Sequence, residues 1–231
     1  MKSGWLVLGA AMLVGCGAPI PPDDDDDNGP GCPPGECAPP PAHESLWPMT
    51  VGSSWTYKIT DPIRGISEKR VRVEKRGTIP GTDREGTLFI SEQDHLFEHS
   101  WQVEEDGLAK RVREEDLSPD GTPKRSTTWS PLTIKALTLP QSAGWESRVT
   151  VVETIVEGGI TDDKNKEFIW RVVAVDVDVT VAGVQMKAIQ VLRDRQDKEG
   201  KARTYWFVPG VGKVREEGER TEELTSFDVK E

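Results

Sequence analysis

The stretch "VAVDVDVTVAG", residues 173–183, decides the fold class. Its valines, from Val173 to Val181, occupy every second position and alternate with alanine, aspartate and threonine. Successive side chains of a β-strand point to opposite faces, so a period of two predicts a strand with one buried and one solvated face. Ala182-Gly183 then predicts a turn.

The same period recurs along the chain, between short turn signals. Trp55, Tyr57 and Ile59 alternate with polar residues. Shorter alternations include Val71/Val73, Val149/Val151, Ile189/Val191 and Tyr205/Phe207. Glycine-containing dipeptides predict turns at 80–81, 106–107, 120–121, 158–159, 199–200 and 209–210. About ten strands with short connections predict an all-β fold, a curved antiparallel sheet that forms a half-barrel, an open barrel or a sandwich.

A short pattern occurs twice at the start of a predicted strand. Pro48-x-x-x-Gly52 precedes Trp55, and Pro140-x-x-x-Gly144 precedes Trp145. The repetition favours two related meanders within the sheet.

The first sixteen residues predict export and lipidation. Lys2 is followed by an apolar run, 5–14, that is shorter than the ~18–20 residues of a bilayer-spanning helix. Leu13-Val14-Gly15-Cys16 resembles a bacterial lipobox. The resemblance implies cleavage after Gly15, a diacylglycerol on the Cys16 thiol and an acyl chain such as palmitate on the new amino terminus. We therefore expect a signal peptide at 1–15 and a lipid anchor in the cell envelope, at the outer membrane on its periplasmic face or at the cell surface.

Residues 16–46 predict a lipidated, disordered linker in front of a β domain at 47–231, because proline, glycine and aspartate leave little to bury. The run Asp23 to Asp27 is interpreted as a solvated spacer. Two alternatives remain: a surface-export signal, and a calcium loop that begins at Asp24 but has Gly35 where a bidentate glutamate is needed.

Cys32 and Cys37 are an even pair in an oxidising compartment once Cys16 is lipidated. The Pro-Pro-Gly-Glu between them could bring the two residues within disulfide range. Zinc would need a further ligand beyond these thiols and His43.

The charge balance narrows the partners. The chain has 29 basic and 40 acidic residues, a formal net charge of −11, and no basic patch in the sequence. Phosphate repulsion then disfavours nucleic acid. We expect contact with the membrane through the acyl chains alone.

Three motifs resemble those of a group of bacterial envelope lipoproteins with no assigned chemistry. They are "WPMTVGSSWTYK" (47–58), "TVAGVQMKAIQV" (180–191) and "TYWFVPGVGKVREE" (204–217). The family implies a domain that opens on a Gly-x-x-Trp-x-Tyr strand and nearly closes on a Tyr-Trp-Phe-x-Pro-Gly-Val-Gly turn. Val184 and Met186 depart from the family pattern, where an aromatic residue is usual.

Catalytic motifs are weak. His95-Leu96-Phe97-Glu98-His99 resembles the motif of inverted zinc peptidases, which requires a helix. Phe97, His99, Trp101 and Val103 alternate instead, which predicts a strand of a hairpin with Trp101 facing inward. Four residues of strand span about 13 Å, too far for one metal.

Other chemistry-bearing residues are also interpreted structurally. "GVGK" (210–213) lacks the rest of a phosphate loop, so Lys213 is expected to start a strand. The acidic groups 104–106 and 114–116 are interpreted as solvated turns.

We therefore expect no metal, no cofactor and no catalysis. Three functions remain: a lipid-anchored, non-catalytic β domain that binds or supports envelope proteins; a carrier of an apolar ligand on the concave face of a half-barrel; and, weakest, a zinc hydrolase using 95–99.

Overall fold

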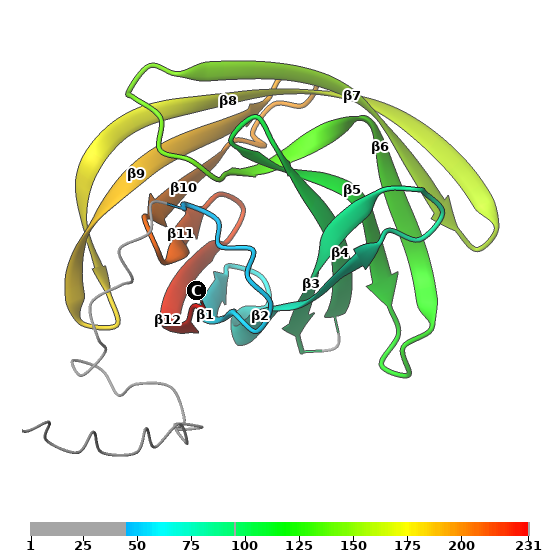
Figure 1. The fold of residues 1–231 in the computed structure, drawn as a ribbon, viewed down its shortest axis with the longest axis horizontal. Coiled ribbons are helices and arrows are strands. Elements are labelled where there is room, and N and C mark those ends of the chain that lie inside the picture. The colour runs from blue at the N-terminus through cyan, green and yellow to red at the C-terminus, as the bar shows by residue number, and fades with distance from the viewer. Residues whose placement is uncertain (1–44, 95, 231) are drawn as a thin grey trace, which may run out of the picture. The chain divides into compact units, whose positions relative to one another are not determined.

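Twelve antiparallel strands form a closed barrel in the computed structural model, which describes residues 45–94 and 96–230 (Figure 1). The predicted signal peptide, Cys16, Cys32, Cys37 and the aspartate run lie outside the described residues. The strands are β1 (Ser54–Asp61), β2 (Gly65–Thr78), β3 (Glu85–Gln93), β4 (Leu96–Glu105), β5 (Leu108–Leu117), β6 (Pro123–Leu137), β7 (Glu146–Glu157), β8 (Ile160–Val181), β9 (Val184–Arg195), β10 (Arg203–Val208), β11 (Gly212–Glu217) and β12 (Thr221–Asp228).

Each strand pairs with its neighbours in sequence, and β1 pairs with β12 to close the barrel. The predicted all-β class and curved antiparallel sheet are confirmed. Closure is complete rather than half, so no described strand is left as a free edge. None of the described residues forms a helix that is long and apolar enough to cross a membrane.

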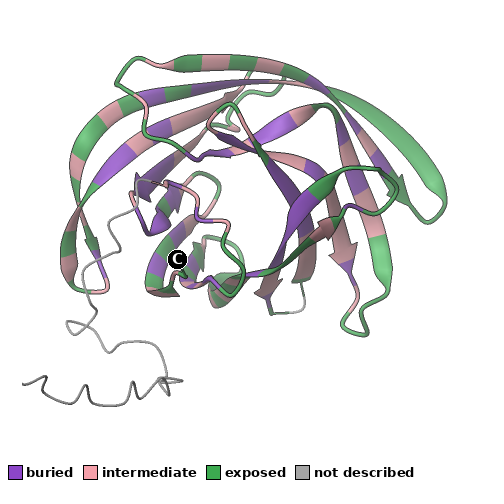
Figure 2. Cartoon of the chain, in the orientation of Figure 1, coloured by how far each residue is buried: buried purple, intermediate pink, exposed green. Residues whose placement is uncertain are grey.

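The period of two places the barrel's interior as expected in most strands. In β1, Trp55, Tyr57 and Ile59 are buried while the intervening side chains are exposed or half-buried. Figure 2 shows the same alternation as stripes along β8 and β9. The turn signals are also confirmed, since every predicted dipeptide lies at or between strand ends.

Residues 173–183, which predicted the fold class, depart from the predicted alternation at their start. The β8–β9 register shifts between Val172 and Val177, and Asp176 has a positive φ of 55°. These irregularities change which side of the strand is buried, because each extra residue reverses the face that follows. Val173 and Val175 are therefore 48% and 40% exposed, whereas Val177 to Val181 pack as predicted.

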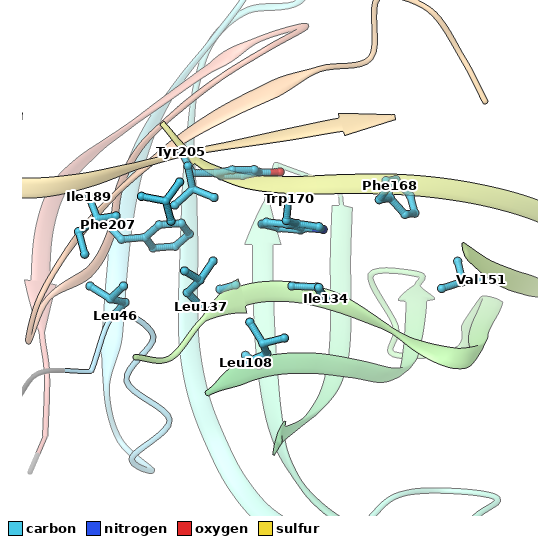
Figure 3. Packing of buried hydrophobic residues seen from close by; sticks show 14 of the residues in the cluster. Leu46, Leu108, Ile134, Leu137, Val151, Phe168, Trp170, Ile189, Tyr205 and Phe207 are labelled. Carbon is cyan, nitrogen blue, oxygen red and sulfur yellow. The ribbon is translucent and has the colours of Figure 1, made fainter. Parts of the chain in front are cut away.

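Two apolar cores fill much of the barrel. In the first, Phe168 and Trp170 point from β8 toward Ile134 on β6 (Figure 3). Tyr205 stacks on Trp170 with ring centroids 5.6 Å apart. The second core is built around Trp55, Tyr57 and Phe89. Together they bury aromatic side chains from strands far apart in sequence, which fixes the barrel's shape.

Residues 45–53 lie across one end of the barrel and form its floor. The backbone N–H of Leu46 donates to the Thr138 carbonyl, and that of Gly210 donates to the Ser45 carbonyl, each at 2.9 Å. The Trp47 ring stacks on Phe89 at 5.6 Å. This segment therefore ties together parts of the rim that belong to different hairpins.

The two proline–glycine repeats make the same backbone hydrogen bonds. Gly52 donates to Val73, and Gly144 donates to Val172, each at 2.9 Å. Both glycines have a positive φ, 93° and 87°. The sequence repeat thus corresponds to a repeated strand entry, one before β1 and one before β7.

A third apolar cluster lies on the outer face of β3–β5. The side chains of Glu98, Ser100 and Gln102 face the interior, so Trp101 points outward, contrary to the prediction. It is nevertheless only 4% exposed, because it packs in a cluster with Ile79 and Leu132. This part of the barrel wall is therefore packed on both faces.

Gly86 is required by this packing. A Cβ there would lie 2.8 Å from Ile79 Cδ1 and 2.9 Å from the Gln102 carbonyl oxygen. We expect Gly86→Ala to lower the free energy of unfolding by about 1–3 kcal/mol, measured by denaturant titration. Gly77, its partner in the register, has no atom within 4 Å of its added Cβ. Gly77→Ala is thus the matched control, and an equal loss in both variants would contradict the steric argument.

Candidate functional site

The barrel encloses a cavity of about 390 Å³ whose lining is charged. Nine basic side chains line it, against four acidic ones. The basic residues are Lys69, Arg111, Lys135, Lys166, Arg193, Arg195, Arg203, Lys213 and Arg220, and the acidic residues are Glu98, Glu153, Glu216 and Glu222. The whole chain carries −11, so the cavity has the opposite sign from the protein around it.

The cavity continues toward the end of the barrel that lies opposite the floor. A cleft at the β1–β2 and β11–β12 turns shares Arg203, Glu216 and Arg220 with the cavity lining. A second cleft, which includes Lys124 and Arg125, shares Arg220 with it. Arg203 and Arg220 therefore extend the basic lining to the turns at this end, where Asp61, Glu216 and Glu219 accompany them.

A bulge in β11 turns two charged residues into the interior. Phe207 pairs with Lys213 and Trp206 pairs with Arg215, so Val214 is an extra residue on β11. Without it, side chains three apart on a strand would face opposite sides. With it, Lys213 and Glu216 both point inward, and Lys213 Nζ lies 2.6 Å from Glu216 Oε2.

Glu222 on β12 is the centre of this ionic network. It is 1% exposed and lies 2.7 Å from Lys213 Nζ, 2.7 Å from Arg220 Nη2 and 3.3 Å from Lys69 Nζ. Burial alone would raise the pKa of this carboxyl, but Lys213 and Lys69 hold the pKa well below its ordinary value. Glu222 is therefore ionised at neutral pH.

Glu216 is the second anion of the network. Arg203 Nη1 lies 2.8 Å from its Oε1. Burial opposes its charge, yet Lys213 and Arg203 lower the pKa of Glu216 to about 2. The reciprocal effect acts on the amine, since burial disfavours its charge while Glu216 and Glu222 raise the pKa of Lys213. Both carboxylates are thus committed to cations of the protein.

Three carboxylates of β4 and β5 form a second group. Oxygens of Glu98, Glu114 and Asp116 lie within 4.8 Å of one another. Arg111 Nη1 already lies 2.8 Å from Glu114 Oε2. Burial and the charge of Glu98 raise the pKa of Glu114 to about 7, against the opposing effect of Arg111. The group is consequently neutralised by Arg111 and by protonation, which makes it a poor cation site.

Two cavity cations have no carboxylate partner. None of the ion pairs among the described residues involves Lys135 or Arg193. Lys135 Nζ lies over the Trp47 ring at 5.7 Å. Burial and the neighbouring charge of Arg111 lower the pKa of Lys135, and burial likewise lowers the pKa of Arg193.

Arg193 lies against an aromatic surface inside the barrel. Its guanidinium carbon is 5.5 Å from the ring centroid of Phe168, 5.8 Å from that of Trp170 and 5.9 Å from that of Tyr205. Such contacts orient a planar guanidinium and leave its donors available at the ring edges. Arg193 is therefore held in place by packing rather than by an acid.

The structure does not assemble the zinc motif. Glu98 and His99 are neighbours on β4 and point to opposite faces of the barrel wall, while His95 lies outside the described residues. The strand reading of this stretch is confirmed. The interpretation of 114–116 as a solvated turn is wrong for Glu114 and Asp116, because β5 carries both into the interior.

Comparisons with known proteins identify the fold of the chain. No protein-family model matches the chain. No curated protein matches it either. A crystal structure from Bacteroides fragilis, described as an exported protein with a YmcC-like fold, has a TM-score of 0.52 at 11% identity and covers 80% of this chain and 99% of that one. The chain has a YmcC-like fold.

A second solved structure, described as a lipoprotein from Parabacteroides distasonis, has a TM-score of 0.42 at 12% identity, with the same coverage of 80% and 99%. At 11% identity, the similarity to the Bacteroides fragilis structure concerns the fold alone. The motif-based assignment to envelope lipoproteins stays a prediction.

The residues that make the barrel's interior basic were not predicted from the sequence. Lys213 was expected only to start a strand, yet it is buried in the ionic network around Glu222. A signal was present in β9, where Ile189, Val191, Arg193 and Arg195 occupy successive positions of one face. An alternating face that changes from apolar to basic indicates a strand that leaves a dry core for a charged cavity.

Proposed function

We propose that this protein is a lipid-anchored, non-catalytic binding protein of the cell envelope, whose barrel holds a small polar ligand. One observation supports it most: the charged cavity of about 390 Å³ inside a closed wall. Ligand sites of small molecules are typically concave spaces of ~300–1,000 Å³ with convergent polar groups.

The nature of the lining favours a polar ligand over the apolar ligand considered from sequence. The hollow among the interior aromatics Trp47, Trp55 and Phe89 measures about 30 Å³, which is the volume of one water molecule rather than of an acyl chain. The larger cavity is surrounded by charges that an apolar ligand would desolvate without replacement. The carrier function is therefore retained with a different ligand.

The sequence supports the anchor. Cys16 ends the stretch Leu13-Val14-Gly15-Cys16, which resembles a lipobox.

Mass spectrometry of protein isolated gently from its own cell envelope tests both parts. Under denaturing conditions we expect a mature chain that starts at Cys16 and carries acyl chains. Under native conditions we expect an additional mass from a non-covalent ligand, lost on unfolding.

Two variants serve as controls. Cys16→Ser should abolish acylation without affecting the native adduct. Thr133→Trp should fill the cavity opposite Arg111 and remove the adduct, provided that a melt shows the variant to be folded. An unacylated wild-type Cys16 contradicts the anchor, and an adduct-free wild-type barrel contradicts the binding function.

A further inference from the structure

We propose that the cavity is an anion site, in which Arg193, Lys135 and Arg111 bind the phosphate or carboxylate group of a small molecule. The inference rests on the proposed binding function and names the class of ligand.

Most cations of the cavity are already paired with a carboxylate. Glu222 serves Lys69, Lys213 and Arg220, and Glu216 serves Lys213 and Arg203. The remaining pairs are Lys166 with Glu153, Arg195 with Asp197 and Arg111 with Glu114. Arg193 and Lys135 remain unpaired within the described chain. The excess positive charge is therefore concentrated on identifiable side chains.

Two arginines of the cavity have a buried Nε donor without an acceptor. Arg193 Nε is buried without an acceptor, and no hydrogen bond of the described residues uses its guanidinium. Arg111 Nε is likewise buried without an acceptor. Buried donors are normally satisfied, and unmet ones cost free energy. Glu153 Oε2 and Glu114 Oε2 are also buried without a hydrogen bond, each beside the cation that it pairs with. Arg193 has no such partner, and an oxyanion would supply the acceptor that it lacks.

The cations of the cavity repel one another. Arg203 and Arg111 repel Arg193 against the attraction of Glu216, and Arg111, Lys69 and Lys213 repel Lys135 against the attraction of Glu98. Glu98 is the one cavity carboxylate outside the ion pairs of the described residues, and Arg111, Lys135 and Lys69 share its single charge, so repulsion among the cations remains. A bound anion would relieve it, whereas a metal cation would increase it.

The size of the cavity and its opening limit which anions can enter. The barrel wall surrounds the cavity on all sides, so a nucleic acid or another extended polyanion could not enter as a chain. Arg203 and Arg220 line both the cavity and the cleft at the charged end, where they would attract anions toward the interior. The planar guanidinium of Arg193 suits two oxygens of one phosphate or carboxylate.

The test uses inorganic pyrophosphate and citrate as probes of the full mature chain, at constant ionic strength. At ten times its dissociation constant, a bound probe should raise the melting temperature by about 4 °C. Calorimetry should show that Arg193→Met and Lys135→Met each weaken binding about 10-fold or more.

Arg215→Met is the matched control. Arg215 on β11 lies over the Trp206 ring at 5.3 Å, and Trp206 is next to Tyr205 on β10, but Trp206 and Arg215 are on the outer face of the barrel. Its removal deletes one arginine stacked on an aromatic ring without touching the cavity, so the affinity should stay within about 2-fold. If Arg193→Met unfolds, Arg193→Lys and Lys135→Met provide the comparison.

Binding of pyrophosphate alone would identify a phosphate ligand, and binding of citrate alone a carboxylate ligand. Either result supports the anion site. No stabilisation by either probe, or equal loss in Arg193→Met and Arg215→Met, overturns it. If the native adduct of the preceding experiment persists while both probes fail, the binding function stands and the anion site does not. If adduct and probe binding are both absent, the binding function itself fails.

Discussion

Replacing Glu222 with glutamine is expected to lower the free energy of unfolding at neutral pH by about 3–5 kcal/mol, a large part of the stability of an ordinary domain. Glutamine keeps the shape but removes the charge that Lys213, Lys69 and Arg220 share at 1% exposure. Lys213 would remain buried with Glu216 as its one ion-pair partner among the described residues, and Lys69 and Arg220 would lose theirs. Denaturant unfolding of the purified barrel measures the loss.

The neighbouring residue supplies the control. Glu223 is exposed and pairs in register with Lys58 and Arg215 on the outer face. Glu223→Gln should change the stability by less than about 0.5 kcal/mol. Similar losses in the two variants would mean that the buried network does not stabilise the barrel.

The same network should give the stability a definite dependence on pH. The pKa of Glu222 and that of Glu216 are lowered in the folded state, so their contribution is complete above the ordinary value of 4.5. It is lost as the pH falls from 4.5 through the folded values, which lie near 2 for Glu216. The difference between wild type and Glu222→Gln should therefore shrink progressively below pH 4.5.

Trp101→Ala is expected to cost about 3–5 kcal/mol, because the indole is 4% exposed among Ile79, Leu88 and Val103 in the outer cluster. His99 is half-buried on the same face and outside that cluster. His99→Ala should accordingly cost much less.

Thermal melts and elemental analysis of the two variants separate packing from metal binding. Packing predicts a metal-free barrel that Trp101→Ala alone destabilises. Stoichiometric zinc lost with His99→Ala would contradict this account and revive the peptidase motif.

The sequence was sufficient for the strands and their turns, since alternation and glycine placement are local properties. It was insufficient where an extra residue reverses the inward face. Val173 and Val175 look like core positions and are exposed, whereas Glu216 looks like a solvated acid and is buried. The bulges responsible for such reversals depend on pairing with a strand elsewhere in the chain.

The basic cavity could not be predicted from the sequence, for a related reason. Its cations come from β2, β5, β6, β8, β9, β10 and β11 and from the turn before β12, so they are dispersed along the sequence. No window of the sequence therefore shows a basic patch. The patch exists only after the barrel has sorted the charges of each strand between its two faces.

The barrel can close only when β12 is available to pair with β1. Ser54 pairs with Asp228, so closure joins residues at the two extremes of the domain. Synthesis delivers the amino terminus first, and β1 must persist with one side unsatisfied until Thr221–Asp228 arrives. An incomplete chain exposes two unpaired strand edges, at β1 and β11, which are templates for self-association. Completion of the last strand is thus the event that separates a closed barrel from an aggregation-prone open sheet.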